Sequence, residues 1–324
     1  MKNRICIFFL LGSVTLSLSA QNHIQTLAFG SCSFQWTRQP MWKYIIANKP
    51  EVWVWLGDNI YANTRNMDEM ARMYQRQLQN RNYKKLLAAC KVVGIWDDHD
   101  YGANDVGKNY PEKETSQQLM LDFIGEPQNT VRRQQKGVYT TYDYGTTGEK
   151  LKLILLDTRY HRDNPGSDAD MLGEEQWKWL ENTLNTDDAD VTIIGSGIQF
   201  ASGPTFFEGW LNFPKSLERL KKMIANSKKK HIIFISGDRH LSEICRTDNL
   251  PSYPIYDFTS SGLTHSNFFM KNSYENSNRI SPLNVKKNFG IIKIDWTLKK
   301  LILESRGKNN QLFFSKEIGF GEIE

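Results

Sequence analysis

Thiol, carboxyl, phenol and imidazole side chains follow several short apolar runs of this sequence. The first run ends in Gly-Ser-Cys, which places Cys32 just beyond it, and the second ends in LGDNIY, with Asp58 and Tyr61. A later run, IIFIS, is followed by GDRH, with Asp238 and His240. Ligand sites in α/β proteins form outside the carboxyl ends of strands, because successive loops converge there on one crevice. We therefore expect these side chains to meet in one site.

The segment WDDHDYGAND follows another apolar run, VVGI, and adds more ligand types. Asp97, Asp98, His99 and Asp100 are consecutive, and Asn104 follows them. Adjacent carboxylates behind a buried strand repel one another unless a cation or ordered donors compensate their charge. A metal-binding role is therefore the favoured interpretation of this segment, with either Asp97 or Asp98 as the ligand.

Each motif alone has a structural alternative. A Gly-Asp pair after a strand is commonly a turn whose carboxylate caps backbone N–H groups. Cys32 alone is typical of a small buried residue, and Tyr61 alone of an ordinary aromatic residue. WDDHD favours a functional role by itself, whereas the other motifs favour chemistry over a structural role only through their joint occurrence at several strand ends.

This set of ligand types suits a pair of metal ions. Two metals held about 3.5–4 Å apart by a shared carboxylate can clamp the attacking and leaving oxygens of a phosphoryl displacement and generate hydroxide near neutral pH. Thiolate, phenolate and imidazole suit trivalent iron, whereas carboxylate and amide oxygens suit calcium or magnesium. A single tetrahedral zinc site is disfavoured, because the Cys and His residues are too few and too far apart for a C-x-x-C cage.

The elements that must position these residues alternate between strand and helix. Short apolar runs bounded by turn residues predict buried strands over 26–30, 52–56, 92–96, 151–156, 191–194 and 232–235. Helical patterns are found over 67–90, 117–124, 174–184 and 216–225, and strand-rich segments follow at 254–258, 289–296, 300–304 and 311–315. Two central sheets covered by helices accommodate this order in one α/β domain over residues 21–324. A dinucleotide-binding fold is disfavoured, because no G-x-G-x-x-G follows the first strand.

The amino terminus, MKNR followed by ICIFFLLGSVTLSLSA, has the layout of a secretory signal peptide over residues 1–20. Cleavage is expected after Ser19 or Ala20. The apolar run is short and interrupted for a membrane-spanning helix, which needs about 20 mostly apolar residues. We therefore expect an exported protein, periplasmic or extracellular, without a stable membrane anchor.

Charge and cysteine content add two limits. The formal net charge of +5 falls by two when Lys2 and Arg4 leave with the leader. This small excess does not predict a nucleic-acid partner. Export would leave three cysteines, Cys32, Cys90 and Cys245. Cys90 and Cys245 either form a disulfide or remain small buried residues.

The blocks GSC, LGDNIY, WDDHDYGAND, LLDTRYHR and SGDRH, in this order, resemble the alkaline phosphatase D family, a branch of the calcineurin-like metallophosphoesterases. The similarity extends from about Ala28 to Ser261. It implies a four-layer α/β/β/α sandwich and a centre that pairs Fe(III) with Ca(II), in which Mn, Mg or Zn are alternatives. It also implies a phosphate ester as substrate, either a monoester or a diester.

The resemblance also implies a role for each matching residue. It gives Asp58 the bridging position, and it divides the other ligands between an iron side (Cys32, Tyr61, His240) and a calcium side (Asp98, Asn104, Asp238). His99 falls where related enzymes carry a histidine that supports the leaving group; alternatively, it is a structural histidine fixed by Asp100. Arg159 and Arg239 can each contact a phosphate oxygen or pair with a nearby aspartate.

The expected function is that of a metal-dependent phosphoesterase, in which hydroxide generated at the metals attacks phosphorus without a covalent phospho-enzyme. A second hypothesis is a non-catalytic protein that binds phosphorylated ligands on the same fold. A third is a metal-independent sugar hydrolase that uses Asp97 or Asp98 with another acid. The sequence makes no prediction of the oligomeric state.

Overall fold

The computed structural model describes residues 23–186, 189–203, 207–248, 253–268 and 275–323. The predicted signal peptide, residues 1–20, lies outside the described residues. Within the described ranges, no helix is both long enough and apolar enough to cross a membrane.

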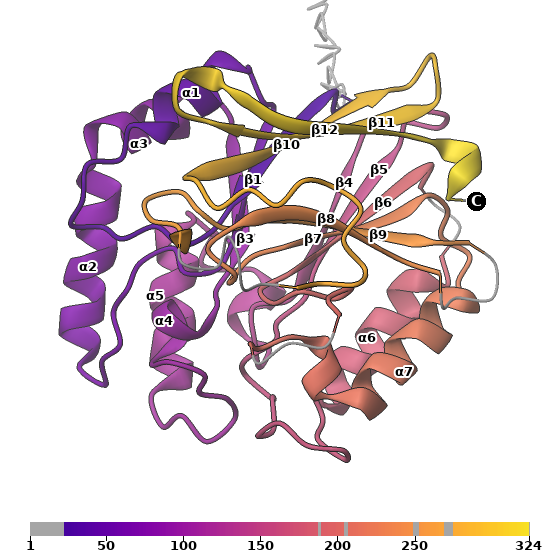
Figure 1. Cartoon of the computed structure of the whole chain (residues 1–324). Helices are drawn as coiled ribbons and strands as arrows, with labels where there is room; N and C mark the ends of the chain where they lie inside the picture. Colours follow the sequence, from indigo (N-terminus) through magenta and orange to yellow (C-terminus); the bar gives the residue numbers. More distant parts are fainter. Residues whose placement is uncertain (1–22, 187–188, 204–206, 249–252, 269–274, 324) are drawn as a thin grey trace, which may run out of the picture.

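Two six-stranded sheets form the centre of the fold (Figure 1). The first contains β1 (Thr26–Gly30), β2 (Val52–Leu56), β3 (Lys91–Ile95), β10 (Asn288–Asp295), β11 (Lys300–Gly307) and β12 (Leu312–Gly319). The second contains β4 (Thr140–Tyr144), β5 (Leu151–Leu155), β6 (Val191–Ser196), β7 (Ile232–Ser236), β8 (Ser242–Thr247) and β9 (Ile255–Ser260). Their orders are β12-β11-β10-β1-β2-β3 and β4-β5-β6-β7-β9-β8.

The centre of each sheet is parallel. β1, β2 and β3 pair in parallel in the first sheet, and β5, β6, β7 and β9 pair in parallel in the second. The outer strands are antiparallel. The carboxyl ends of the parallel strands therefore lie at one edge of each sheet, where the loops that follow them meet.

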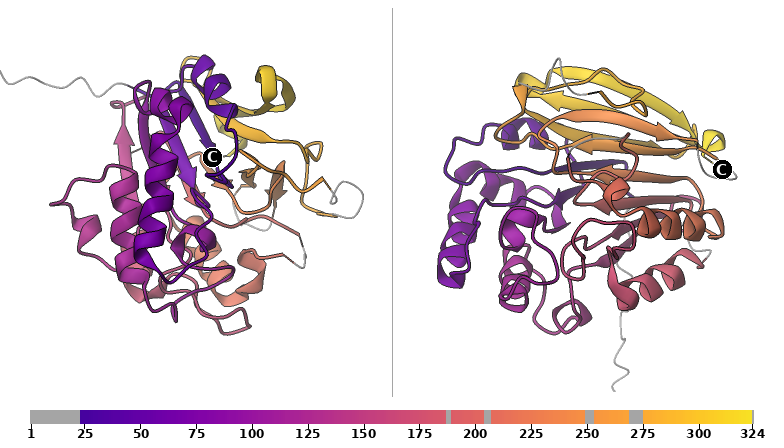
Figure 2. Two further views of the ribbon diagram at one scale, coloured as in Figure 1. Left: turned by 90° about the vertical axis from the view of Figure 1, so that its left-hand side faces the viewer. Right: turned by 60° about the horizontal axis from the view of Figure 1, so that its bottom comes forward.

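Helices cover the outer faces of both sheets. Figures 1 and 2 show α2 (Met67–Gln79) and α5 (Lys113–Phe123) beside β1–β3, and α6 (Gly173–Leu184) and α7 (Pro214–Ala225) beside the second sheet. The short α1 (Met41–Ala47) and α3 (Arg81–Leu87) also belong to the first group, and Trp42 of α1 packs on Trp53 and Trp55 of β2 with ring centroids 5.2 Å apart.

The inner faces of the two sheets pack against each other. Phe29 of β1 and Phe258 of β9 lie edge to face with ring centroids 5.0 Å apart. A Cβ added to Gly195 of β6 would lie 3.0 Å from a methyl group of Leu56, at the end of β2. The order of layers is helix, sheet, sheet, helix, which confirms the predicted four-layer sandwich.

The predicted helix over 67–90 is wrong as one element. It is two helices that meet at Asn80, whose backbone is extended (ψ 122°) and whose Oδ1 accepts hydrogen bonds from the amides of Asn82 (3.0 Å) and Tyr83 (3.1 Å). Asn80 therefore caps the start of α3. Sequence reasoning also missed α1, β4 and β8.

Candidate metal centre

Four of the predicted ligands occupy a backbone conformation that most residues avoid. Cys32, Asp58, Asp238 and His240 have φ angles of 62°, 49°, 66° and 55°. Left-handed backbone is uncommon outside glycine, costs about 1–3 kcal/mol when strained, and clusters at functional sites. Cys32, Asp58 and Asp238 each lie two residues beyond the end of a strand, β1, β2 and β7 respectively. The same sharp turn therefore recurs at three strand ends.

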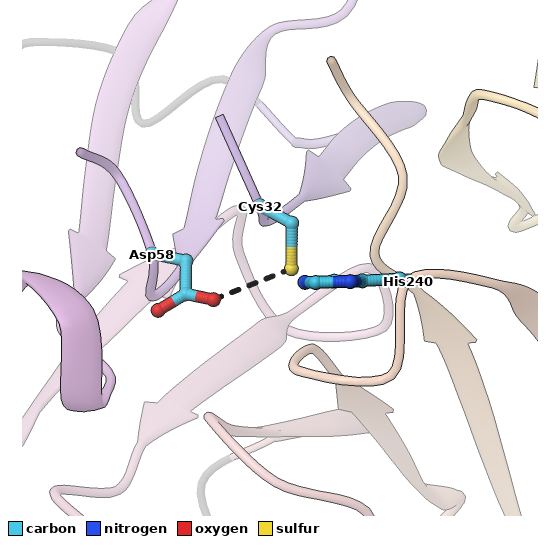
Figure 3. A group of neighbouring side chains, drawn as sticks. All are labelled: Cys32, Asp58 and His240. Carbon is cyan, nitrogen blue, oxygen red and sulfur yellow. Dashed lines mark hydrogen bonds between the residues drawn. The ribbon is translucent and has the colours of Figure 1, made fainter. Parts of the chain in front are cut away.

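One group of donors surrounds a single oxygen of Asp58. The thiol of Cys32 lies 3.4 Å from Asp58 Oδ2, and the hydroxyl of Tyr61 donates a hydrogen bond to the same oxygen at 3.0 Å. The Tyr61 hydroxyl also lies 2.9 Å from His240 Nε2. Figure 3 shows Cys32, Asp58 and His240 pointing toward one another from three separate loops. Thiol, phenol and imidazole are thus gathered around one carboxylate.

A second group shares the same carboxylate. Donor atoms of Asp58, Asp98 and His99 all lie within 4.8 Å of one another, as do those of Asp58, Cys32 and His240. Asp98 Oδ2 is held by the amide of Asp105 at 2.8 Å. Asp58 is therefore the residue that belongs to both groups of donors.

The structure separates the two carboxylates between which the sequence did not decide. Asp98 begins α4 (Asp98–Tyr101) and joins Asp58, whereas Asp97 Oδ1 accepts a hydrogen bond from Arg159 Nε at 2.6 Å. Asp97 is fully buried. Asp98 is therefore the ligand candidate, and Asp97 is the partner of a buried arginine.

A cavity of about 320 Å³ opens onto the second group. Its lining contains Asp98, His99, Asn104, Asp105, Phe207, Glu208, Asp238, Arg239, His240 and Asn267. Asn104 is exposed, and its amide donates to Asp105 Oδ2 at 2.8 Å. Six of the ten predicted site residues line this cavity, and it is large enough for a phosphate group with part of its substituent.

The buried carboxylates create a strongly negative environment. Burial, followed by the charges of Asp98 and Asp97, raises the pKa of Asp58 well above its ordinary value. Burial raises the pKa of Asp238 to about 6, although Arg239 opposes the shift. A cation among these groups would favour their ionised forms. The crowded carboxylates and the two donor sets on either side of Asp58 therefore fit a pair of metal ions.

Asp100 organises the loops after β2 and β3. Its carboxylate accepts hydrogen bonds from the amide of Asp58 (3.0 Å), the side chain of Asn59 (2.6 Å) and the amide of Asp97 (2.8 Å). It does not fix His99, which was the structural alternative for that histidine. His99 Nδ1 instead lies 2.7 Å from Asn63 Oδ1. Asp100 thus ties the proposed bridging residue to the segment that carries Asp98.

The two predicted arginines lie in different environments. Arg159 is fully buried and forms ion pairs with Asp97 and Glu208, so that it lies behind the cavity rather than in its lining. Burial opposes its charge, but Asp97 and Asp98 outweigh this effect and raise the pKa of the guanidinium. Arg239 lines the cavity, with its guanidinium 4.2 Å from the ring centroid of Phe207.

Sequence reasoning missed two residues of the site. The ring of His265 lies 4.4 Å from that of His240 and 5.0 Å from that of Tyr61, measured between centroids. Glu208 lines the cavity and pairs with Arg159 and Arg162. Both residues lie in irregular segments outside the quoted motifs, so no pattern in the sequence marked them.

Gly57 is required where the loops of β2 and β3 touch. Its φ is +90°, and an added Cβ would lie 2.2 Å from the Cβ of Asp97. We expect Gly57→Ala to lower the free energy of unfolding by about 3–4 kcal/mol, since backbone strain and overpacking add. Gly125→Ala is the matched control, because its φ is +74° with nothing within 4 Å of the added atom. Urea titrations measure the free energy of unfolding of both variants. Equal decreases in Gly57→Ala and Gly125→Ala would contradict the close contact between Gly57 and Asp97.

Comparison with known proteins places the fold and the motifs in one family. Residues 27–302 match the family described as PhoD-like phosphatase. The chain belongs to this family. A curated relative, alkaline phosphatase D of Bacillus subtilis (strain 168), is 25% identical over an alignment of 268 residues, and the match covers 67% of this chain. The chain spans 46% of the length of that relative.

Solved structures agree on the fold. A structure of PhoD superposes with a TM-score of 0.74 at 19% identity and covers 94% of this chain and 72% of its own. GAP50, described as the anchor in the inner membrane complex of Plasmodium, superposes with a TM-score of 0.61 at 12% identity. The match covers 92% of this chain and 89% of the GAP50 chain. A dimetal phosphatase from Danio rerio superposes with a TM-score of 0.53 at 12% identity. The match covers 92% of this chain and 100% of that structure. The chain therefore shares its fold with PhoD, GAP50 and this dimetal phosphatase.

Proposed function

We propose that this chain is a phosphate-ester hydrolase whose site holds two metal ions bridged by Asp58. The observation that carries the proposal is that Asp58 lies close to Cys32 and His240 in one donor group and close to Asp98 in the other. A shared carboxylate between two unlike donor sets is the arrangement that a two-metal phosphoesterase needs. Membership of the PhoD-like phosphatase family supports the same reaction.

The donor types suggest which metal belongs on which side. Cys32, Tyr61 and His240 would hold Fe(III), and Asp98, Asn104 and Asp238 would hold Ca(II) or a similar hard divalent ion. When bound, such a pair supplies a nucleophile near neutral pH and neutralises charge on the phosphoryl oxygens. Mn, Mg or Zn in place of either ion remain alternatives that elemental analysis can separate.

The residues around the donors would position the ester. Arg239 lines the cavity and presents a cation to a phosphoryl oxygen. His99 lines the same cavity, and its Nδ1 is engaged by Asn63, which leaves Nε2 as the atom available to the substrate. Because Asn63 Oδ1 accepts the hydrogen of Nδ1, His99 would give a proton to the leaving oxygen from Nε2 in its imidazolium form.

The proposal is tested by hydrolysis of bis-p-nitrophenyl phosphate and p-nitrophenyl phosphate before and after treatment with a chelator. We expect turnover that the chelator abolishes and that iron with calcium restores. Turnover that is indifferent to chelation would favour the metal-independent alternative. The absence of turnover from protein with its full metal content would favour a protein that only binds phosphorylated ligands.

Replacement of His99 tests its role at the leaving group. His99→Gln should lower kcat/KM for phenyl esters by about 10²–10³-fold, because a poor leaving group needs proton donation. The loss should be much smaller for p-nitrophenyl esters, since nitrophenolate leaves without help. An equal loss for both esters would assign His99 to metal or phosphate binding instead.

The binding-only hypothesis has one observation behind it, because GAP50 is described as an anchor on a similar fold. The complete donor set around Asp58 argues for catalysis in this chain, since a protein that only binds need not keep it. The turnover assay described above decides between them.

We also propose that the protein is exported, on the basis of the leader pattern in residues 1–20. Expression of the full chain in a bacterial host should yield a periplasmic or secreted form that begins after Ser19 or Ala20. Mass spectrometry of the intact protein from each cell fraction measures this. An uncleaved form confined to the cytoplasm would contradict export.

A further inference from the structure

Glu208 brings a carboxylate to the wall of the cavity that several proposed ligands also line. It lines the same cavity as Asp98 and Asp238. Its side chain is only 7% exposed and forms ion pairs with Arg159 and Arg162, which are 0% and 1% exposed. A buried acid that faces a phosphate-sized cavity is unexpected, because it repels the anion that the site would bind.

Three consecutive ion pairs connect four charged residues. Asp97 pairs with Arg159, Arg159 with Glu208, and Glu208 with Arg162. Two arginines and two acids give this Asp97–Arg159–Glu208–Arg162 cluster a formal charge of zero. Within it, Glu208 cancels the second guanidinium, which would otherwise leave a net positive charge beside the cavity.

The cluster is coupled directly to the proposed ligand Asp98. Asp97 is its neighbour in the chain, and Arg162 Nη1 donates to the carbonyl of Asp105 at 2.8 Å. The amide of that same Asp105 donates to Asp98 Oδ2 at 2.8 Å. A change of charge in the cluster therefore acts next to the place where a phosphoryl group would lie.

We propose that Glu208 sets the preference of the site for esters by their charge, favouring singly charged phosphodiesters over doubly charged phosphomonoesters. This inference rests on the proposed function and names its substrate class. A monoester carries about −1.5 to −2 near neutral pH because its second pKa is about 6, whereas a diester carries −1. A cluster with no net charge would discriminate little between the two esters. A cluster with one net positive charge would attract the doubly charged monoester more strongly than the singly charged diester.

Two variants of the same cluster should act in opposite directions. Glu208→Gln adds one net positive charge and should raise the ratio of kcat/KM for p-nitrophenyl phosphate to that for bis-p-nitrophenyl phosphate by about tenfold at pH 8. This is the size expected for one charge acting on one additional substrate charge over roughly 10 Å at an effective dielectric constant of about 20. Arg162→Gln removes a positive charge and should lower the ratio by a similar factor. Loss of packing alone would not raise the ratio of the two kcat/KM values in one variant and lower it in the other.

Two control variants distinguish the effect of the charge of Glu208 from effects of side-chain shape and from effects of removing a carboxylate far from the cavity. Glu208→Asp keeps the charge and should keep the wild-type ratio. Glu174→Gln removes a carboxylate that pairs with Arg219 on the surface between α6 and α7, where Glu174 is 78% exposed, and should change nothing. A thermal melt of each variant identifies any that does not fold.

Binding of inorganic phosphate by calorimetry keeps the inference testable without turnover. At pH 8 phosphate should bind Glu208→Gln more tightly and Arg162→Gln more weakly than wild type. If the wild type hydrolyses neither ester, the proposed function fails while the phosphate measurement still tests Glu208. An unchanged ratio and unchanged phosphate affinity in folded Glu208→Gln, or shifts of the same sign in both variants, would overturn the inference.

Discussion

Asp58→Asn is expected to reduce kcat/KM for bis-p-nitrophenyl phosphate by at least about 10³-fold. An amide cannot bridge two cations as a carboxylate does, so the variant loses the shared ligand and with it the several kcal/mol of transition-state stabilisation that metals supply. Steady-state kinetics of the metal-loaded proteins measures the loss. Asp168→Asn is the matched control, because Asp168 is 77% exposed on the surface.

The same variant should be more stable than wild type once both are stripped of metal. Burial and the neighbouring carboxylates of Asp98 and Asp97 raise the pKa of Asp58, which means that its negative charge opposes folding when no cation is present. A neutral amide removes that repulsion. Thermal melts in chelator should therefore give a higher Tm for Asp58→Asn than for wild type. A lower Tm together with retained activity would assign Asp58 a purely structural role.

Arg159→Gln should have its largest effect on stability. Arg159 is fully buried between Asp97 and Glu208, and its loss leaves buried carboxylates without a counter-charge. Breaking a buried pair by removing one partner costs about 3–5 kcal/mol, which corresponds to a fall in Tm of roughly 10 °C for a domain of this size. Differential scanning calorimetry measures it.

Two other arginines provide contrasts for this prediction. Arg219→Gln removes the partner of Glu174 in an exposed pair and should cost less than about 1 kcal/mol. Arg239→Gln should lower kcat/KM and have a smaller effect on Tm than Arg159→Gln, because Arg239 lines the cavity. If Arg159→Gln lost activity without losing stability, Arg159 would be a direct substrate contact.

The strand ends were predictable because the chemistry there is local. Cys32, Asp58 and Asp238 directly follow apolar runs, and the parallel order of the strands brings the loops that carry them to one edge of each sheet. A short sequence segment thus specifies both the strand and the side chain that follows it. Sheets covered by helices were predictable from the strand pattern, since buried parallel strands need helices on their outer faces, whereas the four-layer order came from the family resemblance.

The remaining features depend on contacts between distant parts of the chain. The choice between Asp97 and Asp98 depends on Arg159, which lies about sixty residues away and pairs with only one of them. Glu208 and His265 reach the site from irregular segments that carry no periodicity. The break at Asn80 also escaped detection, because a side-chain cap in the middle of a helical pattern leaves no Pro or Gly signal.

The most direct test of the central claim is the metal content of the purified protein, measured by elemental analysis for wild type, Asp58→Asn and the Asp168→Asn control. We expect about two metal ions per chain, iron with calcium or a similar divalent ion, in wild type and in the control. We expect Asp58→Asn to lose at least one of them. A wild-type protein that is active without metal, or an Asp58→Asn protein with the full metal content, would contradict a centre bridged by Asp58.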